Sequence, residues 1–180
     1  MKTKFLSLVA VFAILLSVIA CQAPKQDNSA ELNQKKELVT KFNDAFQNGT
    51  PEALDAILAA DFKTNSPDPM IPGDGIDHMK GQIQAYKGAN PDMKVTVKKI
   101  VAEGDLVTCY YNVSGTNTGN MGDMPPTGKS FNVDGVDIVR ISDGKIVEHW
   151  GLFDNYKFME QLGMIPSMEE VPAAAVEPAK

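Results

Sequence analysis

Residues 131–152, FNVDGVDIVRISDGKIVEHWGL, predict a β-hairpin. Apolar and polar side chains alternate on both sides of Ser142-Asp143-Gly144, and alternation with period two is typical of strands that bury one face. Asp and Gly are favoured in the tight turns that join antiparallel strands. We therefore expect an antiparallel pair of strands whose inner face packs on the core.

The same alternation continues upstream of this hairpin. Residues 93–98 and 107–113 predict two further strands, and Glu103-Gly104-Asp105 predicts the turn between them. Downstream of the hairpin, Asp154 is a candidate N-cap for a short closing helix. The sheet is therefore expected to be curled and mostly antiparallel.

Apolar residues at helical spacing predict three helices before the first of these strands. The first helix ends at Gly49, the second has Pro51 in its first turn, and the third runs from an Asp77 cap to Gly88. Residues 61–75 are rich in Pro and Gly and predict a long loop. Helices followed by a sheet indicate an α+β fold, in which the sheet can wrap around a cone-shaped cavity.

The N-terminus resembles a bacterial lipoprotein signal. A positively charged start precedes an apolar run that ends in Ala20-Cys21. This likeness to a lipobox implies that residues 1–20 are a signal peptide, that Cys21 is lipidated, and that acyl chains anchor the mature protein to a membrane. Gln22 stands where an Asp would resemble an inner-membrane retention signal, which favours the outer membrane of the cell envelope.

Composition divides the rest of the chain into a tether, a domain and a tail. Residues 21–29 predict a flexible tether, residues 30–165 carry the patterned helices and strands, and residues 166–180 predict a disordered tail with three prolines. The chain has 17 Lys and Arg against 23 Asp and Glu, a net charge of −6, and no basic run. We expect no nucleic-acid partner, because binding phosphates requires clustered positive charge.

The sequence offers little for metal or redox chemistry. The two histidines, His78 and His149, lack the close Cys, His or carboxylate spacing of a dedicated metal site, so we expect neither a metal nor a cofactor. His78 follows the Asp77 cap and is expected to be exposed. Cys109, in an alternating strand, is expected to be a small buried hydrophobe without a chemical role.

Four runs occur together in one order and spacing: Gly115–Gly119 (GTNTG), Met124–Lys129 (MPPTGK), Arg140–Trp150 (RISDGKIVEHW) and Gln161–Gly163 (QLG). They resemble the SnoaL-like polyketide (ester) cyclase family of the nuclear-transport-factor-2-like superfamily. The resemblance implies a cone-shaped α+β barrel, often a homodimer, whose pocket holds a small and rather apolar molecule.

In cyclases of this family, an acid/base Asp on the last strand works with a His and a Gln of the preceding strand. Aligned residue by residue, the Asp falls on Gly151, the His on Asp137 and the Gln on Gly135. Glycine cannot move a proton, so the usual ring closure is not expected here. The glycines are instead expected to line and enlarge the pocket, and Asn65 lies near the family's pocket amide.

The length of the hairpin turn decides which of these positions meet. A two-residue turn places Asp137 opposite Trp150, whereas a three-residue turn with a bulge places Asp137 opposite His149 and Gly135 opposite Gly151. We favour the bulged turn, because the family's cooperating residues then lie on one face.

Side chains alternate along each strand, so the register also sets what lines the pocket. In the bulged register the inward side chains are Asp137, Val139, Val147 and His149, and the outward ones are Ile138, Arg140, Glu148 and Trp150. The other register would place Glu148 and Trp150 in the pocket, which keeps Trp150 as a candidate ligand contact. Tyr111, or its neighbour Tyr110, is a candidate lining residue from the preceding strand.

Two functions fit these residues. The first is an envelope-anchored domain that binds a small, rather apolar molecule without the family's usual acid/base Asp, in which case His149 is a structural histidine. The second is an enzyme, namely an isomerase, hydratase, hydrolase or divergent ester cyclase. It would use Asp137 and His149 as an acid/base pair in which the carboxylate fixes the imidazole tautomer.

The lipobox predicts that the mature protein begins at Cys21 and fractionates with membranes, because two acyl chains anchor a protein stably. Cys21→Ser is expected to remove the lipid, which intact mass spectrometry of the envelope fraction measures. Cleavage at another residue without acyl mass would contradict the prediction.

Overall fold

The computed structural model describes residues 29–166. The predicted signal peptide, the lipidation of Cys21, the tether up to residue 28 and the tail beyond residue 166 lie outside the described residues. The described chain from Glu31 onward belongs to one compact unit. None of the described helices is both long and apolar enough to cross a membrane.

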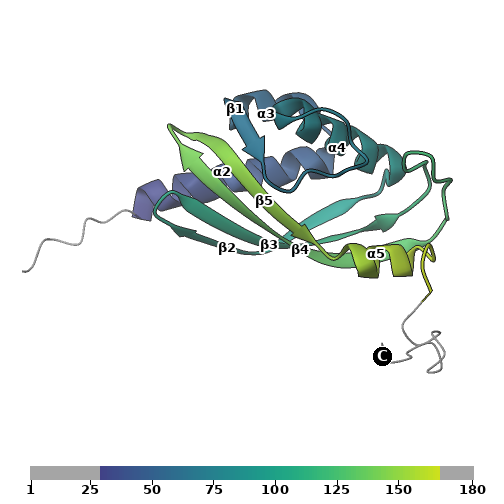
Figure 1. The fold of residues 1–180 in the computed structure, drawn as a ribbon. Coiled ribbons are helices and arrows are strands. Elements are labelled where there is room, and N and C mark those ends of the chain that lie inside the picture. Colours follow the sequence, from purple (N-terminus) through teal and green to yellow (C-terminus); the bar gives the residue numbers. More distant parts are fainter. Residues whose placement is uncertain (1–28, 167–180) are drawn as a thin grey trace, which may run out of the picture. The chain divides into compact units, whose positions relative to one another are not determined.

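Five strands form one mixed sheet in the order β1-β5-β4-β3-β2 (Figure 1). The strands are β1 (Leu58–Thr64), β2 (Lys94–Glu103), β3 (Leu106–Thr116), β4 (Ser130–Ser142) and β5 (Lys145–Phe153). Strands β2 to β5 pair antiparallel, and β1 adds to the edge of β5 in parallel. This confirms the predicted α+β fold with a curled, mostly antiparallel sheet.

Helices cover one side of this sheet. The described helices are α2 (Ser29–Asn48), the short 3-10 helix η1 (Pro51–Ala53), α3 (Leu54–Ile57), α4 (Gly75–Ala89) and α5 (Asn155–Gln161). Figure 1 shows α2 and α4 on the same side of the curved sheet, which is its inner face. The predicted cap of α5 is confirmed, because the Asp154 carboxylate accepts a hydrogen bond from the Lys157 backbone N–H at 3.0 Å.

The main core lies between the inner face of the sheet and the helices α2 and α4. Its members that are no more than 2 % exposed include Val39, Phe42, Ala45, Met79, Ile83, Val107, Cys109, Val139 and Ile146. A second cluster around Phe131, Val133 and Leu162 lies where α5 packs on β4. Burial of this apolar surface is the main force that holds the helices on the sheet.

Two boundaries differ from the sequence prediction. Helix α4 begins at Gly75 after an Asp74 N-cap rather than at an Asp77 cap. The predicted second helix is short, and Leu58–Thr64, which we expected to end a helix and begin a loop, forms β1. Leu58 and Phe62 are 2 % and 3 % exposed, so tertiary burial and pairing with β5 override a weak local pattern.

The β4–β5 hairpin combines features of both predicted turns. Asp143 and Gly144 have φ angles of +50° and +73°, as in a two-residue type I′ turn, and Ser142 pairs with Lys145. A bulge follows one step later, because Ile141 pairs with Ile146 but Arg140 pairs with Glu148.

Both predicted registers are therefore wrong. Asp137 lies opposite Gly151, not opposite Trp150 or His149. The bulge turns Ile146 inward and leaves Val147 half-buried, in place of the inward Val147 that we expected. Past the bulge, His149 faces inward as predicted, with 6 % of its surface exposed.

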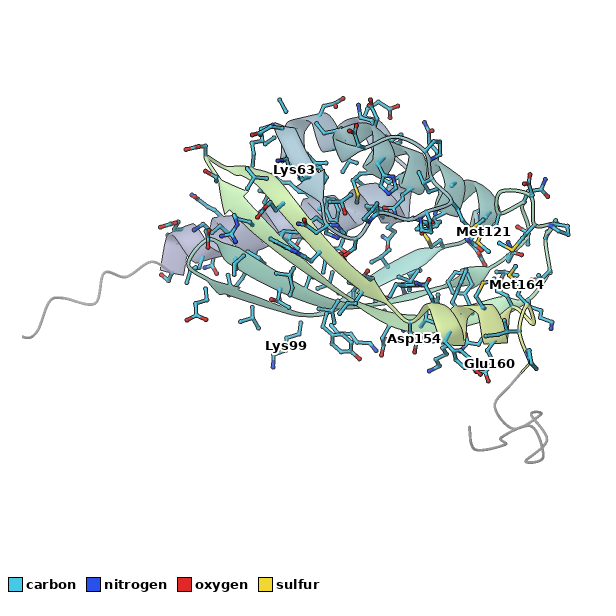
Figure 2. The ribbon with its side chains drawn as sticks, in the orientation of Figure 1. Lys63, Lys99, Met121, Asp154, Glu160 and Met164 are labelled. Atoms are coloured by element: carbon cyan, nitrogen blue, oxygen red, sulfur yellow. The ribbon has the colours of Figure 1, made fainter. Side chains whose placement is uncertain are left out.

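The outer face of the sheet carries the side chains that the preferred register assigned to it. Ile138 is 37 % exposed, and Arg140 forms an ion pair with Glu148 at 2.8 Å. Trp150 pairs with Ile138 across the strands. The Arg140 guanidinium lies over the Trp150 ring, with its Cζ atom 6.0 Å from the ring centre. Lys99 extends away from the sheet on the same side (Figure 2).

The bulge predicts unequal costs for truncating two neighbouring side chains. Ile146→Ala is expected to lower the free energy of unfolding by about 2–5 kcal/mol, because Ile146 is fully buried in the core. Val147→Ala is the control, with an expected loss of about 1 kcal/mol or less. Denaturant unfolding measures both, and a larger loss for Val147→Ala would contradict the register.

Candidate functional site

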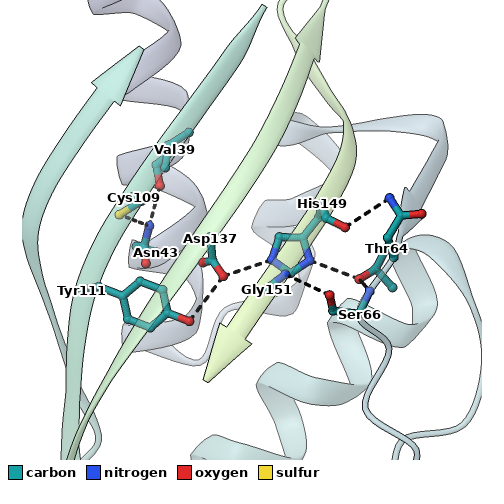
Figure 3. Close-up of polar contacts among 10 residues, drawn as sticks. Val39, Asn43, Thr64, Ser66, Cys109, Tyr111, Asp137, His149 and Gly151 are labelled. Atoms are coloured by element: carbon teal, nitrogen blue, oxygen red, sulfur yellow. Dashed lines mark hydrogen bonds and ion pairs between the residues drawn. The ribbon is translucent and has the colours of Figure 1, made fainter. Parts of the chain in front are cut away.

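Asp137 and His149 meet on the inner face of the sheet. His149 pairs with Val139, so Asp137 is its diagonal neighbour on β4, which a long side chain can reach. His149 Nε2 lies 3.1 Å from Asp137 Oδ1 (Figure 3), and each residue is 6 % exposed. The predicted inner-face contact between these two residues is therefore present, through a register that we did not predict.

Gly151 provides the space for this diagonal contact. It lies directly opposite Asp137, two residues beyond His149 on β5, and it has no side chain. A Cβ atom added there would lie 3.0 Å from His149 Cε1 and 3.2 Å from Asp137 Oδ1. The imidazole thus leans along β5, over the Gly151 backbone, to reach the carboxylate.

Gly135 has the same function for Tyr111. The two residues lie directly opposite each other on β4 and β3, and a Cβ atom on Gly135 would lie 2.6 Å from Tyr111 Cζ. The phenol therefore passes over Gly135 and donates to Asp137 Oδ1 at 3.3 Å. The space above both glycines is filled by side chains, so the expectation that they enlarge a pocket is wrong.

The strand β1 and the loop after it fix the other edge of His149. Thr64 Oγ1 lies 3.1 Å from His149 Nδ1 and accepts a hydrogen bond from the Ser66 backbone N–H at 3.3 Å. Asn65 N–H donates to the His149 carbonyl oxygen at 2.7 Å, and Gly151 N–H donates to Ser66 Oγ at 3.1 Å. These bonds continue the β1–β5 ladder past the end of β1.

These contacts select one tautomer of a neutral His149 imidazole. An ionised Asp137 carboxylate can only accept, so Nε2 carries the proton in that tautomer. The Thr64 hydroxyl, which accepts from the Ser66 backbone, then donates to Nδ1. Both ring nitrogens of His149 are thus occupied within the protein.

Tyr111 and Cys109 complete the surroundings of Asp137. Burial, together with the charge of Asp137 and the hydrogen bond to it, holds the pKa of Tyr111 well above its ordinary value, so the phenol remains a donor. Burial and Asp137 also raise the pKa of the Cys109 thiol to about 11. Cys109 is fully buried and accepts from Asn43 Nδ2 at 3.6 Å, which agrees with the inert role expected for it.

The remaining sequence candidates lie at other places. Asn65 is exposed and holds the His149 backbone rather than presenting its amide to the interior. Trp150 lies on the outer face, away from Asp137. His78 was expected to be exposed but is 1 % exposed, because its Nε2 accepts a hydrogen bond from the Asp68 backbone N–H at 3.1 Å.

Three contributors were missed by sequence reasoning. Thr64 and Ser66 lie in and just after β1, a strand without clear alternation, so no local signal placed them beside His149. Phe42 packs its ring against the imidazole, with ring centres 5.7 Å apart. Its position in the apolar stripe of α2 identified it as core but not as a neighbour of His149. Within residues 29–166, no three His, Cys, Asp or Glu side chains are grouped so that they could hold a metal ion.

A curled mixed sheet with helices on its inner face defines the ketosteroid isomerase-like class of α+β folds. A protein of that fold from Catenulispora acidiphila superposes with a TM-score of 0.58 at 22 % identity, covering 71 % of this chain and 92 % of that chain. Residues 36–162 match the SnoaL-like polyketide cyclase family, and the chain belongs to this family.

Two solved structures from Streptomyces are similar to the chain at higher identity. IdmH from Streptomyces antibioticus, described as a candidate polyketide cyclase, is 30 % identical, with a TM-score of 0.63 over 71 % of this chain and 97 % of that chain. TsrD from Streptomyces laurentii is 28 % identical, with a TM-score of 0.67 over 74 % of this chain and 97 % of that chain. No curated protein matches the sequence.

The packing above Gly151 predicts that a single added methyl group disturbs the site. Gly151→Ala is expected to lower the free energy of unfolding by about 1–3 kcal/mol, because the new Cβ atom would crowd His149 and Asp137.

Gly88→Ala is the matched control, because a Cβ atom at this helical glycine meets nothing within 4 Å. It should leave stability unchanged or raise it by up to about 1 kcal/mol. Denaturant unfolding compares the two variants, and a Gly151→Ala protein as stable as the native one would refute the crowding.

Proposed function

We propose that this protein is an envelope-anchored SnoaL-like domain that binds a small, rather apolar molecule on the inner face of its sheet and transfers a proton there through Asp137. The observation that carries the proposal is the convergence of Tyr111 and His149 on one carboxylate oxygen, Asp137 Oδ1. Two donors on Oδ1 fix the carboxylate and leave Oδ2 to accept a proton from a ligand.

The geometry favours exchanging the roles that the sequence analysis gave to Asp137 and His149. His149 has no free ring nitrogen, since Asp137 occupies Nε2 and Thr64 occupies Nδ1. In this proposal the imidazole therefore orients the carboxylate, and Asp137 is the group that exchanges a proton with the ligand. An isomerase, hydratase or hydrolase reaction needs such a base.

The position of the Asp137 carboxylate supports the proposal that it takes the place of the family's acid/base Asp. The family resemblance assigns the acid/base Asp to position 151, which is glycine here. Asp137 Oδ1 lies 3.2 Å from the place where a Cβ atom of residue 151 would lie. The neighbouring strand β4 thus places a carboxyl group close to the same point. The Tyr111 phenol bonds this carboxyl group, and the Phe42 ring packs on the His149 imidazole.

Anchoring and assembly belong to the same proposal. The lipobox sequence supports attachment through Cys21 to the outer membrane, for which the mass measurement above is the test. The family resemblance supports a homodimer, and the molar mass in solution tests it.

Proton abstraction by Asp137 can be tested without knowing the natural substrate. 5-Nitrobenzisoxazole is a small, neutral, apolar compound that opens to a coloured phenolate when a base removes its ring C–H proton. The native protein is expected to catalyse this opening, and Asp137→Asn is expected to lower kcat/KM by about 100-fold or more.

Asp134→Asn is the matched control for this experiment. Asp134 lies on the same strand, but its carboxylate faces the outer side, where it bonds Lys98 and Tyr110. The control removes the same charge and should keep the native rate. Equal rates in the two variants, or no rate above that of acetate for the native protein, would refute the proposal.

A further inference from the structure

We infer that the site selects ligands that carry a hydrogen-bond donor, above all protonated amines with an apolar body, and that it rejects anions. This inference rests on the proposed binding of a small molecule at Asp137 and specifies its chemical class. It follows from the hydrogen bonds that the described residues make around Asp137 and around Asp68.

The donors in contact with the Asp137 carboxylate and with His149 are used within the protein. Tyr111 O–H and His149 Nε2–H both bond Asp137 Oδ1. Beside a neutral imidazole, the hydroxyl proton of Thr64 bonds His149 Nδ1. What remains for a ligand is a set of acceptors, namely Asp137 Oδ2 and the lone pairs of the Tyr111 oxygen.

The side chains from α4 and from the loop before it are bonded in the same way, with their donors already used. Tyr86 of α4 donates its phenol proton to Asp68 Oδ2, and the Met70 backbone N–H donates to Asp68 Oδ1 at 2.8 Å. Burial and Asp68 raise the pKa of Tyr86, and Tyr86 in turn helps to raise the pKa of Tyr111, so the two phenols are electrostatic neighbours. This side therefore adds a second carboxylate and a second phenol whose proton is already bonded.

Among the described residues, one buried side-chain donor lacks a hydrogen-bond partner, and a ligand cannot reach it. His78 Nε2 accepts from the Asp68 backbone, so the imidazole proton is on Nδ1, which has no hydrogen-bond partner. That atom is enclosed by the fold, and His78 as a whole is only 1 % exposed. It does not offer a hydrogen bond to a molecule at Asp137.

Neither Lys nor Arg lies beside Asp137 in the interior. Among the described residues, the buried polar side chains include Asp137 and His149 but no Lys or Arg. Lys80, Lys98 and Arg140 form their ion pairs with partly exposed carboxylates. An anion beside Asp137 would therefore face like charge without compensation, whereas an ammonium group would gain a charged hydrogen bond and contact with aromatic rings.

Three probes with one apolar body test this selectivity: 3-phenylpropylamine, 3-phenylpropan-1-ol and 3-phenylpropanoate. Calorimetric titration of the native protein at pH 7 should give the tightest binding for the amine and at least about tenfold weaker binding for the carboxylate. In Asp137→Asn the difference between amine and carboxylate should fall to a few fold. In Asp134→Asn, which removes an equal charge from the outer face, the native order should remain.

A measurement on the native protein locates the amine without relying on a variant. Binding of 3-phenylpropylamine should shift the NMR signals of the His149 imidazole and the Tyr111 ring. The inference is overturned if the carboxylate binds as tightly as the amine, if no probe binds, or if the amine leaves these signals unmoved. It is also overturned if the two variants show the same selectivity, because the overall charge of −6 would then explain it.

The two proposals fail in different ways. Selective amine binding that depends on Asp137, without opening of 5-nitrobenzisoxazole, would refute proton transfer and retain the ligand class. Opening of 5-nitrobenzisoxazole that depends on Asp137, together with equal binding of amine and carboxylate, would retain proton transfer and refute the ligand class.

Discussion

Asp137 Oδ1 accepts hydrogen bonds from Tyr111 of β3 and from His149 of β5, and the inner face of the sheet is organised around this atom. Both donors reach this atom across a glycine, because Gly135 and Gly151 leave the space that the side chains of Tyr111 and His149 fill. A carboxylate that is 6 % exposed requires such partners, since an unpaired buried charge is costly. In the sequence, the two glycines stand where the family's cyclases have functional side chains. In the structure, they allow Tyr111 and His149 to reach the Asp137 carboxylate.

The backbone places these groups through one irregularity. The bulge after Ile146 shifts the register of β5 by one residue, so Ile146 joins the core while His149 still faces inward. Strand β1 then closes the far edge of β5 and brings Thr64 against the imidazole. The orientation of His149 therefore depends on three strands, although its acceptor Asp137 lies on only one of them.

The sequence predicted the parts that depend on local pattern. Alternation in β2 to β5, the Asp154 cap and the apolar stripe of α2 were sufficient for the α+β fold, and alternation brought Asp137 and His149 to one face. It did not predict β1, whose burial depends on a distant partner, or the place of the bulge, which depends on how Ile146 packs. The reach of Tyr111 and His149 across glycines is a property of side chains in three dimensions, so pairing rules between directly opposite residues missed it.

The central claim is that His149 holds the Asp137 carboxylate through Nε2–H while Thr64 occupies Nδ1. Nitrogen-15 NMR of the labelled native protein distinguishes the protonated from the bare ring nitrogen of His149 directly. The structure predicts a proton on Nε2 and an unprotonated Nδ1, and Thr64→Val should change the Nδ1 signal because it removes the hydroxyl donor. A bare Nε2 with the proton on Nδ1 would contradict the account.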